Sequence, residues 1–206
     1  MNKVIVCLFT LCLLPVVPAS AGVVLYSNGP FNGTIGSWDI TGHSVSDSFS
    51  ISSAAIMAGF DFASWNTPGD VISEVTWSVG TTAFGSDLVS FETASVSAVF
   101  NFSNGSGSDI YTNTVSGLSV PLNAGPTYWL TLQNAHVSGG DPSWDQNNGP
   151  STAWEWNGDA HTSPVGINSE TFDILGGSSV PEPGTLGLLS GGILVMLGAL
   201  RRRKIG

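Results

Sequence analysis

The sequence predicts an all-β body, a two-sheet sandwich that is jelly-roll-like, followed by a short C-terminal transmembrane helix. Three observations lead to this prediction. Apolar and polar residues alternate with a period of two in several short segments, as they do on a half-buried strand. Asn-Gly pairs, which form the preferred two-residue hairpin turn, recur between these segments. Near the C-terminus, a glycine-rich apolar stretch is followed at once by four cations.

The N-terminal segment 1–21 has the pattern of a secretory signal peptide. A single cation, Lys3, precedes an apolar run, and Ala19 and Ala21 supply the small residues required just before Gly22. Signal peptidase is therefore expected to cut after Ala21, and this segment is left out of the fold. Both cysteines of the chain lie inside it, so the processed protein has no thiol and no disulfide.

Nine short segments between the two ends are predicted strands. Apart from Ser73, every second residue from Val71 to Val79 is apolar, and every even position of segment 94–102 is apolar. Each of these two segments is therefore expected to bury one face. The nine segments are residues 23–26, 45–51, 55–62, 71–79, 94–102, 110–115, 128–133, 153–156 and 171–175.

Turn signals separate the predicted strands. Five Asn-Gly pairs begin at Asn28, Asn32, Asn104, Asn148 and Asn157. Each is read as a hairpin turn, because both positions tolerate positive φ. Short strands and turns of this kind over residues 22–175 favour a sandwich of two sheets.

The charge of the body is one-sided. The 206-residue chain has a formal net charge of −10, and its five basic residues all lie in the removable ends. All fifteen carboxylates lie between Gly22 and Glu182, so removal of both ends leaves a net charge of −15, or −14 if the cut precedes Glu182. Nucleic acid is excluded as a partner, because phosphate binding depends on Lys and Arg. Neutral glycans and divalent cations remain permitted.

The C-terminal segment 180–206 has three parts and follows a Gly/Ser linker at 176–179. The parts are the motif Pro181, Glu182, Pro183, the apolar stretch 185–200, and the basic cluster Arg201, Arg202, Arg203, Lys204. As a helix, the apolar stretch would be roughly 24 Å long, whereas a bilayer core is about 30 Å thick, so it is a marginal permanent anchor. The basic cluster is expected to stay in the cytoplasm with the body outside.

This order of parts resembles the PEP-CTERM sorting signal of Gram-negative bacteria, which is read by a membrane-embedded protease and transpeptidase called exosortase. The resemblance covers the tail, 180–206, and implies that exosortase cuts it near Pro181, Glu182 and Pro183. It also implies an inner-membrane precursor whose body ends at the cell surface or outside the cell, typically in bacteria that make extracellular polysaccharide. Such tails are also called ice-binding protein C-terminal domains, a label for the tail and not for the activity of the body.

The densest polar and aromatic segment, 133–159, holds a candidate glycan contact made of Trp144, Asp141, Asp145 and Asn147. Aromatic faces stack on the C–H face of a sugar, while carboxylates and amides bond its hydroxyls. The alternative is that the Asp and Asn residues cap turns and that the tryptophans of 153–156 fill the core.

A calcium ion at Asp141 and Asp145 is a second candidate, since Ca²⁺ takes oxygen ligands, but the spacing is not that of an EF-hand. The same sequence pattern is also explained by Asp and Asn residues that form turns, so no metal or other cofactor is assigned. The three histidines have no ligand-like spacing for zinc.

Catalytic motifs are absent from the sequence, since it has no Gly-x-Ser-x-Gly and no His-Glu-x-x-His. We expect a non-enzymatic exported surface or extracellular-matrix protein. The alternative is a carbohydrate-binding module for extracellular polysaccharide. A glycan-active enzyme is the third reading, because a carboxylate pair drawn from Glu74, Glu92, Glu155 and Glu170 stays open.

Overall fold

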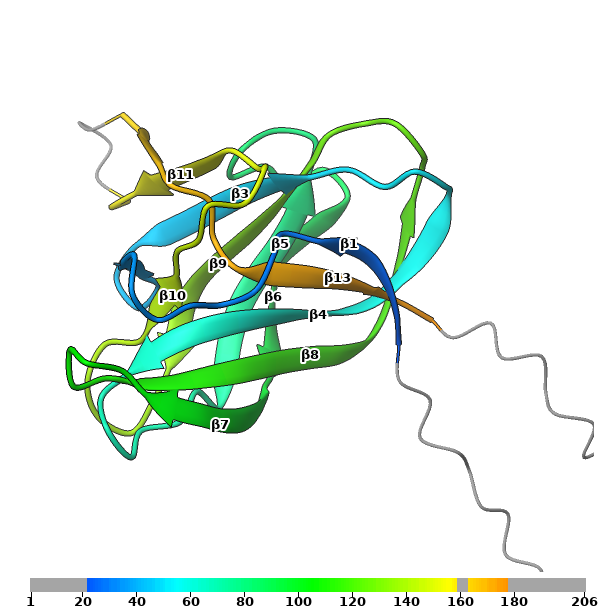
Figure 1. Cartoon of the computed structure of the whole chain (residues 1–206). Helices are drawn as coiled ribbons and strands as arrows, with labels where there is room; N and C mark the ends of the chain where they lie inside the picture. The colour runs from blue at the N-terminus through cyan, green and yellow to red at the C-terminus, as the bar shows by residue number, and fades with distance from the viewer. Residues whose placement is uncertain (1–21, 159–162, 178–206) are drawn as a thin grey trace, which may run out of the picture. The chain divides into compact units, whose positions relative to one another are not determined.

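The computed structural model describes residues 22–158 and 163–177. The predicted signal peptide, sorting motif, helix 185–200 and basic cluster lie outside the described residues. Thirteen strands are described (Figure 1). They are β1 (Val23–Ser27), β2 (Ser37–Asp39), β3 (Ser44–Phe49), β4 (Ala55–Asn66), β5 (Glu74–Gly80), β6 (Val89–Ser95), β7 (Ser97–Ser103), β8 (Asp109–Leu122), β9 (Tyr128–His136), β10 (Ser143–Asp145), β11 (Ala153–Trp156), β12 (Val165–Ile167) and β13 (Phe172–Gly176).

The strands form two antiparallel sheets, so the prediction of an all-β, two-sheet sandwich is confirmed. Sheet A contains β1, β13, β4, β8 and β7, with β10 and β2 attached beside β4. Sheet B has the order β12-β11-β3-β9-β5-β6. The chain crosses between the sheets repeatedly, from β1 in sheet A to β3 in sheet B, back to β4 in sheet A and on to β5 in sheet B. In the part of the chain that is described, no helix is long and apolar enough to cross a membrane.

Strand β4 organises sheet A. One edge of β4 pairs with β8 along nearly its whole length. The other edge is shared end to end by β13, which pairs with residues 57–62, and by β10, which pairs with Ser64 and Trp65. The junction between β13 and β10 is closed by a bridge from Gln146 to Glu170. Polar side chains gather at this junction.

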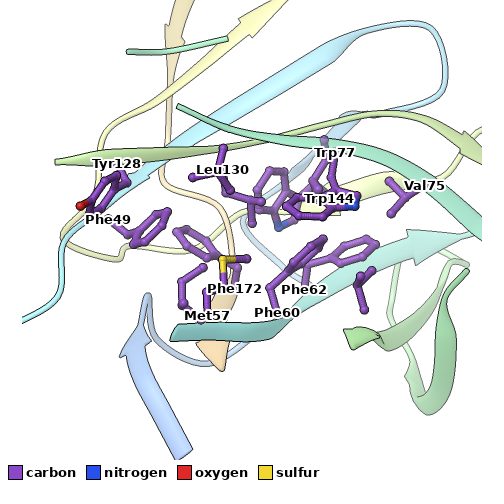
Figure 2. Close-up of a cluster of buried hydrophobic side chains, with 14 of the residues drawn as sticks. Phe49, Met57, Phe60, Phe62, Val75, Trp77, Tyr128, Leu130, Trp144 and Phe172 are labelled. Atoms are coloured by element: carbon purple, nitrogen blue, oxygen red, sulfur yellow. The ribbon is translucent and has the colours of Figure 1, made fainter. Parts of the chain in front are cut away.

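Aromatic side chains fill the space between the sheets (Figure 2). Phe60 of sheet A lies 5.5 Å from Trp77 of sheet B, measured between ring centroids, and Phe172 lies 6.2 Å from Phe49. Trp77 and Phe60 are fully buried. Burial of rings of this size contributes about 1.5–3 kcal/mol each, so the inter-sheet contacts are a main source of stability.

Four strands were not predicted from the sequence: β2, β6, β10 and β12. Three of them have only three residues, too few to display a period of two. The predicted segment 94–102 is wrong as one strand, because it leaves sheet B at Ser95 and enters sheet A at Ser97. Its ring at Phe100 is 52% exposed, since β7 is an edge strand. Val71 precedes β5 and is likewise exposed.

The Asn-Gly pairs turn the chain but are not two-residue hairpins. The pairs at Asn28, Asn32 and Asn148 lie in connections between strands that do not pair with each other. The pair at Asn104 sits in the β7–β8 hairpin, whose loop covers residues 104–108. Positive φ is used at Gly29 and Gly33 among others. The predicted linker 176–179 begins one residue too early, because Gly176 is the buried last residue of β13.

Candidate functional site

The predicted glycan contact at Trp144 is wrong, because this side chain belongs to the core. Trp144 is 0% exposed and packs between Phe62 and Phe172, with ring centroids 6.2 and 5.8 Å away. Its indole N–H donates to the carbonyl oxygen of Thr171 at 2.8 Å. A ring enclosed on both faces cannot stack on a sugar.

Asp145 and Asn147, the next two predicted contacts, are buried as well. The Asp145 carboxylate accepts hydrogen bonds from the backbone N–H groups of Asn32 and Gly33, each at 3.1 Å, and from the Thr171 hydroxyl and the Trp65 indole. Its oxygens are therefore occupied by donors and not open to a cation or a sugar hydroxyl. Asn147 donates to the carbonyl oxygen of Asn28 at 2.6 Å.

Asp141, the fourth predicted contact, is exposed to solvent, whereas Asp145 is buried. Among residues 22–158 and 163–177, no group of three or more His, Cys, Asp or Glu side chains is arranged to hold a metal ion. The two carboxylates proposed as calcium ligands thus do not form part of such a group.

The alternative reading of the tryptophans in β11 is also wrong. Ala153 and Glu155 face inward, whereas Trp154 and Trp156 are half-buried on the outer side of the strand. The Trp156 ring packs edge-on against Phe84 with centroids 6.1 Å apart. The side chains of β11 do alternate between two faces, but the buried positions are Ala153 and Glu155 and not the two tryptophans.

A buried polar cluster, made of Asn28, Asp47, Ser151, Ser169 and Glu170, lies beside the β13–β10 junction. We call it the Asn28 cluster. The amide nitrogen of Asn28 lies within 3.2 Å of Asp47 Oδ2 and within 2.7 Å of the hydroxyls of Ser151 and Ser169. It also approaches the backbone carbonyl oxygen of Glu170. An amide has two N–H groups, so it can serve only two of these acceptors at a time.

The carboxylates of the cluster are shifted towards their protonated forms. Burial raises the pKa of Asp47 to about 6, although hydrogen bonds from the Glu170 backbone N–H and from Ser151 lower it in part. Burial raises the pKa of Glu170 well above its usual value, and the negative charges of Asp47 and Asp145 add to this effect. Glu170 Oε2 is buried and has no hydrogen-bond partner. Because the body has no Lys or Arg, a proton is the neutralising charge that the solvent supplies most directly.

A cavity of about 380 Å³ opens on the outer face of sheet A, and we call it the sheet A pocket. Its floor comes from Asp61 and Ala63 of β4, Thr112 of β8 and Asp173 of β13. Its side wall comes from the loop after β1, chiefly Phe31. Asp61, Thr112 and Asp173 are half-buried and face outward, because Phe62, Asn113 and Phe172, their neighbours along the strands, point into the core. Ala63 lies on the same face but is only 2% exposed.

Asp61 and Asp173 are directly opposite each other in the β4–β13 pair. Burial is the largest cause that raises the pKa of Asp61, and the charge of Asp173 adds to it, while a hydrogen bond from Thr114 lowers it. Oδ1 of Asp61 is enclosed and has no hydrogen-bond partner. The pocket is thus lined by two carboxylates, and the described residues that line it include no Lys or Arg.

The wall of the pocket is held by the buried polar groups. Asp145 binds the backbone of Asn32 and Gly33, the two residues after Phe31, and the Asn104 amide donates to the carbonyl oxygen of Gly33 at 3.1 Å. The Phe31 ring packs against Phe102 with centroids 6.2 Å apart. Asp145 is thus a positioning residue for the wall and not a ligand contact.

Sequence reasoning missed Phe31, Asp61 and Asp173. The two carboxylates did carry a signal, since each interrupts an apolar run, Phe60-Asp61-Phe62 and Phe172-Asp173-Ile174. A charged residue between two apolar ones is typical of the outer face of a strand. The sequence pattern does not show that β4 and β13 are neighbours, or that their register places Asp61 opposite Asp173. Chemically, the arrangement offers carboxylates, which can accept hydrogen bonds from the hydroxyl groups of a ligand, beside an aromatic side chain.

Comparison with known families adds one match. The model of the PEP-CTERM protein-sorting motif matches residues 179–204. The chain thus carries this motif directly after the described sandwich, and the resemblance seen in the tail is confirmed. Such a motif implies an exported protein, anchored transiently in a membrane and processed by exosortase. No curated protein matches the chain.

Proposed function

We propose that this exosortase substrate is a non-enzymatic protein of the cell surface or extracellular matrix, delivered there by its PEP-CTERM motif. The observation that carries the proposal is the position of that motif. It begins at residue 179, three residues after the end of β13, so processing near it would leave the sandwich whole.

The charge of the sandwich supports an extracellular role. With both ends removed, the body has fifteen or fourteen carboxylates and no Lys or Arg. Such a surface is soluble and self-repelling, and it discourages binding to nucleic acid and to anionic lipid.

The non-enzymatic part of the proposal is supported by the placement of the glutamates once open for glycoside hydrolysis. Glu155 and Glu170 are buried, and Glu155 lies 2.5 Å from His43. Glu74 and Glu92 are exposed on β5 and β6. These four glutamates are divided between core and surface, so they do not supply the pair of carboxylates that a glycosidase places across one substrate cleft. Release of reducing sugar from the producing organism's own polysaccharide would revive the enzyme reading.

Intact mass and cell fractionation in strains with and without exosortase test the proposal. With exosortase, we expect a protein that has lost the apolar stretch and the basic cluster and is recovered at the surface or in the medium. Without it, the full tail should remain, in the membrane fraction. Retention of the full tail in both strains would replace the proposal with a plain membrane anchor.

A carbohydrate-binding module is the second candidate function. The sheet A pocket favours it, because an aromatic wall beside two carboxylates is an arrangement suited to a sugar.

A further inference from the structure

We infer that the sheet A pocket binds an uncharged glycan, which stacks on Phe31 and donates hydroxyl hydrogen bonds to Asp61 and Asp173. This inference rests on the carbohydrate-binding candidate and gives it a site and a ligand class.

The carboxylate pair is the first observation. Asp61 and Asp173 face each other directly across two antiparallel strands, a placement in which like charges destabilise a sheet. No Lys or Arg exists between Gly22 and Glu182 to offset them. A ligand with several hydroxyl donors can bond Asp173 and the oxygen of Asp61 other than the enclosed Oδ1, and the hydroxyl of Thr112 lies on the same floor.

The apolar part of the pocket is the second observation. Pro30 and Phe31 line the wall and Ala63 lines the floor. A bare cation gains nothing from these groups. A sugar ring does, because it has an apolar C–H face and a rim of hydroxyls, which matches a pocket with one apolar side and one acceptor side.

The wall of the pocket is held in place by contacts within the protein, without a ligand. Asp145 and Asn104 hold the backbone of Gly33, and an added Cβ there would lie 3.1–3.2 Å from Ile110 and Phe102, so the loop packs closely on sheet A. A wall that is already ordered pays less entropy on binding.

The charge of the pocket selects against acidic sugars. Two carboxylates would face any uronate or sulfate group, and the whole body is anionic. We therefore expect the uncharged class and not an acidic polysaccharide.

A second cavity extends the site. It has a volume of about 680 Å³ and shares Ser27, Gly29 and Pro30 with the sheet A pocket. Thr34 and Asn148 line its far part with a hydroxyl and an amide. Two adjoining cavities suit a polymer with several sugar units better than a free monosaccharide.

Affinity electrophoresis of the full-length protein, in detergent and chelator, tests the inference. The probes are the uncharged and the anionic fractions of the producing organism's extracellular polysaccharide, separated by anion exchange. We expect retardation by the uncharged fraction only. Phe31→Ala should weaken it about tenfold through lost stacking. Asp173→Asn should weaken it about tenfold or more, as expected for a lost bond to a charged acceptor.

Trp129→Ala is the matched control, because this half-buried aromatic residue lies on β9 of sheet B. It should retain the wild-type affinity, and thermal unfolding of each variant checks that it is folded. Asp173→Asn keeps the shape of the side chain, so it remains informative if Phe31→Ala fails to fold. No retardation of the wild type by the uncharged fraction, retardation by the anionic fraction that Phe31→Ala weakens, or equal affinity of Asp173→Asn would overturn the inference.

Failure here is distinguishable from failure of the surface role. A protein that is processed and reaches the cell surface but ignores the uncharged fraction contradicts only the glycan site. A protein that keeps its tail in both strains contradicts the delivery proposal, whatever it binds.

Discussion

At the scale of single residues, burial decides the chemistry of the carboxylates. Asp47, Asp145 and Glu170 are all buried and all have a raised pKa, although each accepts hydrogen bonds. In most proteins a Lys or Arg would pair with them, but this body has none. Burial of these carboxylates with no Lys or Arg beside them is therefore a cost that the fold carries.

This cost predicts that the protein becomes more stable as pH falls from 7 to about 4. The pKa of Asp47 is about 6 in the folded state and 3.8 in the unfolded state, so between these values the folded state binds more protons. The free energy of unfolding then decreases as pH rises through this window, by about 3 kcal/mol for Asp47. Glu170 acts in the same direction. Urea unfolding at several pH values measures the effect.

Glu170→Gln is the matched variant for the pH prediction. Gln keeps an oxygen to accept the bond from Gln146 and places its amide where Oε2 has no partner. The variant should show a weaker dependence on pH than the wild type. The exposed Asp87 has a lowered pKa and opposes the trend, but full exposure makes it a minor contributor. Wild-type stability that drops on acidification over this window would contradict the assignment.

The burial of Trp144 gives a second prediction at this scale. Trp144→Ala should lower the free energy of unfolding by about 3–5 kcal/mol, as for other buried Trp and Phe truncations. Trp154→Ala, on the outer side of β11, should cost roughly 1 kcal/mol or less. Equal costs in chemical unfolding would mean that Trp144 is not a core residue.

At the scale of elements, β4 and β8 form the longest strand pairing among the described residues, and a bulge interrupts its regular register. The register shifts between Met57 and Gly59 of β4, where β8 supplies Val115 and Ser116. At Gly59 the two backbones come so close that an added Cβ would run into the carbonyl oxygen of Val115. A side chain at this position has no room without movement of β8.

Gly59→Ala should therefore destabilise the sandwich by about 1–3 kcal/mol, the usual cost of overpacking. Gly105→Ala is the control, because nothing lies within 4 Å of its added Cβ in the β7–β8 loop. Thermal unfolding of both variants measures the difference. A Gly59 variant as stable as the Gly105 variant would show that the bulge can widen freely.

The length of each strand and its pairing partners also determined how well it could be predicted from the sequence. The strands with clear alternation, such as β5 and β9, were predicted near their observed bounds. β10 was not, because its three residues carry Trp144 and Asp145, which look like a surface motif when read alone. Pairing with β4 and β2 on its two edges is what buries them.

At the scale of the whole molecule, charge and the tail define the route of the protein. The tail holds every cation of the chain except Lys3, so processing changes the net charge as well as the location. The anionic body that remains raises the question of whether calcium stabilises it.

We expect calcium to leave the thermal midpoint unchanged beyond the effect of ionic strength. The oxygens of Asp145 are occupied by donors, and the described residues contain no group of three metal-ligating side chains. Thermal unfolding in calcium chloride, in sodium chloride of equal ionic strength and in chelator measures this. A midpoint that rises only with calcium would restore a cation site.

The sequence by itself determined the features that depend on composition and on neighbouring residues. These are the sorting motif, the lack of Lys and Arg between Gly22 and Glu182, and the all-β character of the body. Only the tertiary structure decided which polar residues share a site. Asn28 meets Ser151 and Glu170, more than a hundred residues away, and Asp61 meets Asp173, because strand order and register bring them together. Local alternation reports which face a residue is on, but carries no information about which strand lies beside it.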